Sequence, residues 1–174
     1  MAPDDPLLDL IEGAREGDDH AVAELVRRTQ PDVWRLCQAL GSPGEVEDLV
    51  QETYLRALRS LPTFRGDSSV RSWLLAIGRH VCADHVRRRT RQRRLLERVR
   101  SVAERHDAPG PTSVDDLLEG LSPERREAFV LTQLLGLSYD DAARALDCPV
   151  GTVRSRVARA RADLLAVVQR ADSL

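Results

Sequence analysis

Apolar residues recur every three to four positions through most of this chain. This spacing is typical of amphipathic helices, which turn one apolar face towards a core. No segment shows the alternation of apolar and polar residues that marks a half-buried strand. The pattern predicts an all-α fold, with helical stretches at residues 7–14, 21–26, 33–40, 46–61, 73–86, 128–135, 142–146 and 150–168.

Proline and glycine residues indicate where these helices begin and end. Pro31, followed by an aspartate, indicates a helix start, and Pro62 ends the helix before it. The strongest break is at 106–112, where two prolines flank a glycine that no helix would continue through. We therefore expect two small helical domains, residues 1–105 and 114–174, joined by a linker at residues 106–113.

Composition narrows the class of protein further. Aromatic residues make up 3% of the chain, which suits helices better than sheets. The three cysteines, Cys37, Cys82 and Cys148, are an odd number at wide spacing, so we expect buried thiols in a reducing compartment and no disulfide framework. No apolar leader and no run of about 18 apolar residues occurs. We therefore expect a cytoplasmic protein with no membrane insertion of its own.

Charge is sorted along the chain. The net charge is −7 for residues 1–60, +8 for 61–106, −6 for 107–148 and +3 for 149–174, so each acidic block precedes a basic one. All 26 basic residues are arginine, which indicates a GC-rich coding genome more than it indicates selection for guanidinium chemistry. Six arginines fall within residues 87–94, and such a run favours contact with a polyanion.

The second half has helix-turn-helix spacing: a helix from about Ser138 to Leu146, a turn at 147–149, and a helix from about Val150 to Gln169. The second helix is apolar on one side, with Thr152, Ser155 and Arg159 opposite. Arg154 and Arg156 lie on its flanks, where phosphate is the natural partner. For Arg161, near the apolar side, we expect an ion pair or snorkelling. Charge alone is equally consistent with an ordinary solvated basic face.

The residues Leu-Ser-Tyr-Asp-Asp-Ala-Ala at 137–143 and Cys-Pro-Val-Gly-Thr-Val-Arg-Ser-Arg-Val-Ala-Arg-Ala-Arg at 148–161 resemble region 4 of the extracytoplasmic-function (ECF) sigma factors. These proteins direct RNA polymerase to promoters. The resemblance implies that this domain reads the −35 promoter element. The residues that it implies for this contact are Thr152, Arg154, Ser155, Arg156 and Arg159.

The first half resembles the same family independently. Residues 47–58, Glu-Asp-Leu-Val-Gln-Glu-Thr-Tyr-Leu-Arg-Ala-Leu, resemble region 2.2, the family's docking helix for the polymerase clamp. The resemblance implies that polymerase is bound by Asp48, Leu49, Gln51, Glu52 and Leu55. All of these except Leu49 stand at i, i+3, i+4 and i+7, along one helical face. An ordinary solvated acidic face is the alternative.

Residues 64–80 resemble regions 2.3 and 2.4, which in the family bind and open the −10 element. Opening a duplex requires the capture of an unstacked base while arginines hold the backbone. The resemblance and the basic run after it imply contacts from Arg65, Ser68, Ser69, Arg71, Arg79, His80, Arg87 and Arg88. His80 stands where many members have asparagine, which affects base preference. A single Trp73 stands where housekeeping members have paired tryptophans, and we expect it in the domain core.

Neither catalysis nor cofactor binding is predicted. His80, Cys82, Asp84 and His85 could suggest a metal site, but His80 and Asp84 share a helical face that the other two do not. This spacing favours a His80–Asp84 pair over a metal ion. The chain has no Gly-rich phosphate loop, zincin motif or nucleophile elbow. We therefore expect no enzyme, no metal and no cofactor.

Together the motifs predict an alternative sigma factor that binds core RNA polymerase and promoter DNA, helps melt the −10 element and initiates transcription of a specific regulon. The chain leaves little room for a sensor domain, so we expect control by a separate anti-sigma protein. One rival is a stand-alone helix-turn-helix regulator that binds duplex DNA as a dimer. Another is an adaptor whose basic helix binds RNA or an acidic protein. Neither rival requires this order of motifs.

Overall fold

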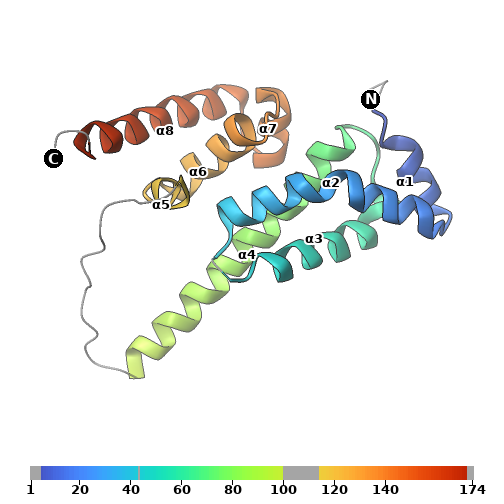
Figure 1. Ribbon diagram of the computed structural model, residues 1–174, viewed down its shortest axis with the longest axis horizontal. Helices are drawn as coiled ribbons and strands as arrows, with labels where there is room; N and C mark the ends of the chain where they lie inside the picture. Colours follow the sequence, from blue (N-terminus) through green and yellow to red (C-terminus); the bar gives the residue numbers. More distant parts are fainter. Residues whose placement is uncertain (1–4, 43, 100–113, 172–174) are drawn as a thin grey trace.

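The computed structural model describes residues 5–42, 44–99 and 114–171, with no side-chain detail for 93–99, 114–116 and 171. The described residues form helices and no strands, which confirms the all-α prediction (Figure 1). The elements are α1 (Leu8–Arg15), α2 (Asp19–Leu40), α3 (Val46–Ser60), the 3₁₀ turn η1 (Leu61–Thr63), α4 (Val70–Val99), α5 (Val114–Glu119), α6 (Pro123–Phe129), the π turn η2 (Val130–Leu134), α7 (Tyr139–Leu146) and α8 (Val150–Ala171).

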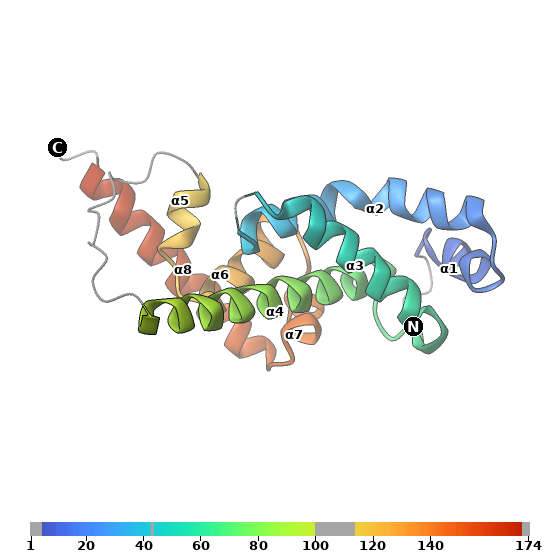
Figure 2. The same ribbon diagram turned by 90° about the horizontal axis from the view of Figure 1, so that it is seen from below.

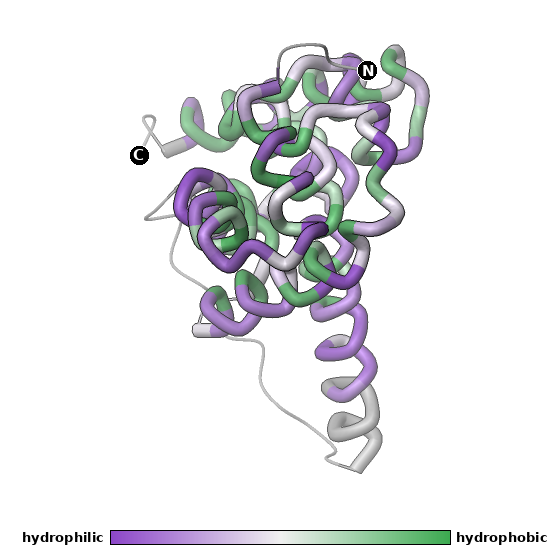
Figure 3. Tube along the Cα trace, turned by 90° about the vertical axis from the view of Figure 1, so that its right-hand side faces the viewer, coloured by the Kyte–Doolittle hydropathy of each residue, from purple (hydrophilic) through white to green (hydrophobic). Residues whose placement is uncertain are grey.

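The long helix α4 is the centre of the molecule. It packs against α2 and α3, with α1 against α2, and it also contacts α7 of the second half (Figures 1 and 2). Its later turns leave the bundle, and the part of this stretch that is coloured in Figure 3 is hydrophilic. The basic run at 87–94 therefore begins where α4 emerges from the bundle.

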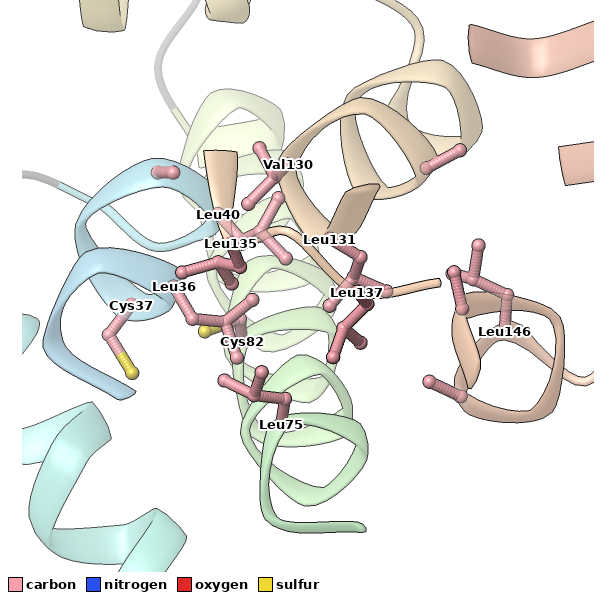
Figure 4. Packing of buried hydrophobic residues seen from close by; sticks show 14 of the residues in the cluster. Leu36, Cys37, Leu40, Leu75, Cys82, Val130, Leu131, Leu135, Leu137 and Leu146 are labelled. Atoms are coloured by element: carbon pink, nitrogen blue, oxygen red, sulfur yellow. The ribbon is translucent and has the colours of Figure 1, made fainter. Parts of the chain in front are cut away.

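The two halves of the chain share one hydrophobic core. Figure 4 shows side chains from α2 and α4 facing side chains that follow α6. Leu75 of α4 is 1% exposed, and Leu131 of η2 is fully buried in the same cluster. The predicted linker at 106–113 lies outside the described residues. The two expected domains therefore pack against each other in this arrangement.

A smaller cluster closes the far end of the first half. Ile11, Leu25, Leu61 and Phe64 are buried in it. The ring of Trp73 lies 4.8 Å from that of Phe64, centroid to centroid, and Trp73 also packs against the main core. The expectation that Trp73 belongs to the domain core is confirmed.

The predicted helix start at Pro31 is wrong, because α2 continues through this residue. Proline removes one backbone donor and crowds the preceding turn, at a cost of about 3 kcal/mol in a helix interior. Here the helix buries Leu25, Val33 and Leu36 along one face, on both sides of the proline. That tertiary burial outweighs the local cost, since each such side chain stabilises the fold by roughly 1.5–3 kcal/mol.

Small residues let α4 approach α2 and α3. A Cβ added to Gly78 would lie 2.8 Å from Leu36 Cδ2 and 3.4 Å from Thr53 Cγ2. Cys82, one turn further along α4, and Cys37 are both buried, as expected, while Cys148 is only half-buried. Contact with the Cys37 thiol and burial both raise the pKa of Cys82, so this sulfur stays protonated.

No helix in the described part of the chain is both long enough and apolar enough to cross a membrane.

Candidate nucleic-acid interface

The predicted helix-turn-helix is formed by α7, a turn at 147–149 and α8. Ser138 begins α7, and its hydroxyl oxygen accepts a hydrogen bond from the Asp141 N–H at 3.0 Å. Asp147 ends α7 in the left-handed region, with φ 49°, and turns the chain sharply. Pro149 then accepts hydrogen bonds from the N–H groups of Thr152 and Val153, which starts α8.

Ser138 makes a testable contribution to this unit. Ser138→Ala removes the N-cap of α7 and is expected to lower the free energy of unfolding by about 1 kcal/mol, measured by urea denaturation. Ser122, at the start of α6, is a matched control because its side chain makes no capping hydrogen bond. Ser122→Ala should leave the unfolding midpoint almost unchanged. Equal losses in the two variants would contradict a specific role for the Ser138 cap.

Helix α8 presents a polar face away from its packing contacts. Val153, Val157 and Ala160 are buried as α8 packs against α6 and α7. On the other side, Ser155 is exposed, and its hydroxyl donates to the Thr152 carbonyl at 2.9 Å. Arg159 is exposed and makes no hydrogen bond or ion pair with any described residue. Its guanidinium is therefore available to a partner.

Arginines on the flanks of α8 are held by other parts of the chain. Arg154 lies over the ring of Tyr139, with Cζ 5.9 Å from the ring centroid. Arg156 Nη1 is 3.7 Å from Cys148 Sγ. Arg161 donates to Gln133 Oε1 at 2.5 Å. Because this partner is a neutral amide, the ion pair considered for Arg161 is not formed with any described residue.

The outer face of α3 carries most of the residues implied for polymerase binding. Asp48 and Gln51 are exposed, and Leu55 is 43% exposed. Glu52 is half-buried and forms an ion pair with Arg56 at 2.7 Å. These residues line one surface that remains open to solvent.

Leu49 requires a correction. It is only 4% exposed and belongs to the main core, where it also contacts the turn after α2. A side chain that is buried inside the first half has no surface to offer to polymerase. Leu49 holds α3 against the bundle from within, and the predicted direct contact is wrong.

The loop before α4 holds the first residues implied for −10 binding. Arg65 is exposed, while Ser68 and Ser69 are half-buried. The Ser69 oxygen accepts from the Ser72 N–H at 3.1 Å, and its hydroxyl donates to Ser72 Oγ at 2.7 Å. Ser69 therefore caps the start of α4. Gly66, with φ +72°, allows the loop to turn in a conformation that side chains disfavour.

Arg71 and Arg79 both face the second half of the chain. Arg71 donates to Asp32 Oδ2 at 2.6 Å and to the Leu135 carbonyl at 2.5 Å. Arg79 is 14% exposed and forms an ion pair with Glu127 at 3.2 Å. The guanidinium groups are thus occupied between the halves. DNA would reach them only if these bonds were exchanged, a constraint that the sequence did not reveal.

The expected His80–Asp84 pair is not present. Asp84 instead accepts from Arg56 at 2.8 Å and from Arg87 at 2.6 Å, and these hydrogen bonds lower its pKa. His80 contacts the Ala76 carbonyl and Arg79, both at 2.7 Å. A guanidinium is permanently charged and offers a planar set of N–H donors, so it binds a carboxylate more strongly than an imidazole does.

Arg87 and Arg88 are exposed on the emerging end of α4. Within the described part of the chain, no three His, Cys, Asp or Glu side chains are grouped so that they could hold a metal ion.

The contact of Tyr139 with Arg154, a residue implied for −35 binding, was not predicted from the sequence. Tyr139 lies fifteen positions before Arg154, on a different helix, so helical periodicity does not predict that the two side chains meet. The packing of α7 against α8 brings them together. The partners Asp32 and Glu127 were missed for the same reason. No local signal marks a contact between elements that are distant in sequence.

Comparisons with known proteins agree with this geometry. The family models "Sigma-70 region 2" and "Sigma-70, region 4" match residues 25–92 and 112–164. The chain is 44% identical to the ECF RNA polymerase sigma factor SigC of Mycobacterium tuberculosis, over 94% of this chain and 91% of that protein. It is 34% identical to the ECF RNA polymerase sigma-E factor of Escherichia coli, over 87% and 88%.

Two solved structures are also similar to the chain. CnrH in complex with the cytosolic domain of CnrY has a TM-score of 0.75 and 31% identity, covering 96% of this chain and 99% of that one. The sigma factor RpoE in complex with the anti-sigma factor NepR, from Bartonella quintana, has a TM-score of 0.72 and 31% identity, covering 84% and 96%.

Proposed function

The chain belongs to the ECF group of the sigma-70 family, and from this premise we propose that its two halves bind two promoter elements on behalf of RNA polymerase. Residues 1–105 bind core polymerase and the −10 element, residues 114–174 read the −35 element, and the boundary falls at 106–113. Members of this family are transcription initiation factors and not enzymes, so polymerase carries out the phosphoryl transfer. The place of action is the cytoplasm.

The observation that carries this proposal is the open polar face of α8. Thr152, Ser155 and Arg159 lie on the second helix of a helix-turn-helix, on the side opposite its buried valines. Such a helix enters the major groove, where an arginine binds guanine O6 and N7 through two hydrogen bonds. Arg159 suits this role because no described residue occupies its donors.

Polymerase docking is proposed for the outer face of α3. This face combines carboxylates such as Asp48 with the amide of Gln51 and the exposed apolar side chain of Leu55. An exposed apolar residue surrounded by charge is typical of the centre of a protein interface. The acidic residues suit a basic partner surface and would increase the association rate.

Leu55→Ala is expected to weaken binding to core polymerase about tenfold, because truncation of a central anchor typically costs more than 1 kcal/mol. Fluorescence titration of the labelled protein with core polymerase would measure it. Leu134→Ala is the matched control, since Leu134 is 41% exposed, close to the 43% of Leu55, but lies in the second half. Equal affinities for the two variants would show that the α3 face is not the docking surface.

An anti-sigma protein is the proposed regulator. One similar structure is of a sigma factor bound to an anti-sigma factor, and another is of a complex with a cytosolic domain. We propose that a protein of this kind also binds this chain and covers its polymerase-binding and DNA-binding faces. Affinity purification from the native host should recover this partner when transcription of the regulon is off. Recovery of polymerase alone under those conditions would count against it.

The first experiment is run-off transcription with purified core polymerase on a promoter library, with and without the protein. Start sites that appear only with the protein would support the proposal and reveal its promoter. The stand-alone regulator predicts a different result: tight binding to a duplex without polymerase, and no start site that depends on the protein. The adaptor predicts sequence-independent binding that falls steeply with salt.

A further inference from the structure

One guanidinium of the helix-turn-helix is held by an aromatic ring. Tyr139 is the first residue of α7, and Arg154 lies in the second turn of α8. The Arg154 Cζ atom is 5.9 Å from the centroid of the Tyr139 ring, within the range of a cation–π contact. Tyr139 is partly buried against the main core, whereas Arg154 is exposed. A fixed ring on the first helix therefore orients a long, exposed side chain on the second.

A ring contact differs from the other contacts that hold arginines in this unit. Arg144 donates to Asp141 at 2.7 Å, and Arg161 donates to Gln133, so part of each donor set is used. The face of a ring attracts the cation without accepting its N–H groups. No described residue accepts a hydrogen bond from Arg154. Arg154 is thus oriented and still keeps all its donors.

The place of Arg154 on α8 indicates what those donors would meet. Thr152, Ser155 and Arg159 hold the middle of the polar face, and Arg154 lies on the flank beside the N-terminus of α7. In a helix-turn-helix the first helix crosses the sugar–phosphate backbone while the second lies in the groove. A guanidinium between the two helices is therefore placed for phosphate, which fixes the position of the protein on the duplex.

We propose that Tyr139 is a positioning residue of the −35 interface, whose ring holds Arg154 for contact with one phosphate of the promoter backbone. The inference rests on the proposed function of α8. A guanidinium that is already oriented loses less rotamer freedom when DNA binds, so the contact contributes more to affinity. The phosphate contact in turn fixes the register of α8 in the groove.

The test measures binding of holoenzyme, made from the full chain and core polymerase, to a promoter duplex recovered from the run-off library, across a range of NaCl concentrations. The variants are Tyr139→Leu, Tyr139→Phe, Arg154→Ala and the double variant Tyr139→Leu with Arg154→Ala. Tyr139→Leu should weaken binding about two- to fivefold, equally on all promoter sequences, and lower the salt slope by up to about 1. Tyr139→Phe should bind like the wild type. In the Arg154→Ala background, Tyr139→Leu should have no further effect.

Three results would overturn the proposal. An equal loss from Tyr139→Leu with and without Arg154 would show that the ring acts on the fold, which thermal unfolding of the same variants would report. A loss in Tyr139→Phe as large as in Tyr139→Leu would assign the effect to the hydroxyl. A changed preference at one −35 base pair would show that Arg154 contacts a base.

Failure of the proposed function gives a different result. If wild-type holoenzyme shows no promoter binding that depends on this protein, the function fails and the inference fails with it. If Arg159→Ala abolishes the −35 preference while Arg154→Ala binds like the wild type, the function stands and only the role of Tyr139 falls.

Discussion

Arg159→Ala is expected to reduce run-off transcription from promoters with a −35 element by about ten- to a hundredfold. The side chain is exposed in the middle of the polar face of α8 and makes no hydrogen bond or ion pair to the described part of the chain. Its removal therefore takes away the proposed DNA contact without breaking a hydrogen bond or ion pair to any described residue. A good bidentate contact between arginine and guanine contributes about 1–3 kcal/mol of discrimination, or about 5- to 150-fold, and the expected loss lies within this range.

The control for Arg159→Ala is Arg170→Ala. Arg170 is also an exposed arginine of α8, three turns further along, and within the described residues its Nε donates to the Ala166 carbonyl of the same helix. Both variants lose one positive charge, so a general electrostatic effect would lower transcription equally. Only Arg159→Ala should also relax the base preference within the −35 element, measured on the same promoter library. Equal activities for the two variants would place the −35 contact elsewhere on the chain.

Gly41→Ala is expected to lower the free energy of unfolding by about 1–3 kcal/mol, the usual cost of overpacking a core. A Cβ at this position would lie 2.4 Å from the Cys37 carbonyl oxygen and 2.4 Å from Leu49 Cδ1. The first neighbour is backbone and cannot move aside alone. Gly41 follows the last turn of α2 and contacts α3 there. A side chain at this position would therefore force α2 and α3 apart.

Gly151→Ala is the matched control for Gly41→Ala. Gly151 lies in the first turn of α8, and a Cβ there would have no neighbour within 4 Å. Alanine favours the helix over glycine, so this variant should keep or raise stability, by up to about 1 kcal/mol. Urea denaturation of both variants measures the difference. Unfolding of Gly41→Ala at the wild-type urea concentration would show that the α2–α3 turn tolerates a side chain.

The helix-turn-helix shows how far local signals reach. The helix start near Ser138, the turn at 147–149 and the apolar side of the second helix were predicted from spacing, and the structure has all three. Pro31 shows where a local rule fails. Proline usually ends or kinks a helix because of its neighbours within that helix. Here α2 continues through Pro31 because its buried side chains pack against other helices.

The candidate site divides in the same way. The sequence pattern grouped Asp48, Gln51 and Leu55 on one face because helical periodicity fixes which side chains neighbour one another. The same periodicity left Leu49 off this face, but it could not show that Leu49 is buried, since burial depends on which helices pack around α3. Nor could it show that the Arg71 guanidinium is hydrogen-bonded within the protein, because the acceptors, Asp32 and Leu135, are distant from it in sequence.

By itself, the sequence determined the helical class of this protein, the order of its motifs and the polar face of α8. These properties depend on residues within one or two helical turns of each other, so the local sequence is enough to determine them. Only the tertiary structure decided that both halves share a core, that α2 continues through Pro31, and that Tyr139 holds Arg154. Those outcomes depend on packing between segments far apart in the chain, where many weak contacts outweigh any single local preference.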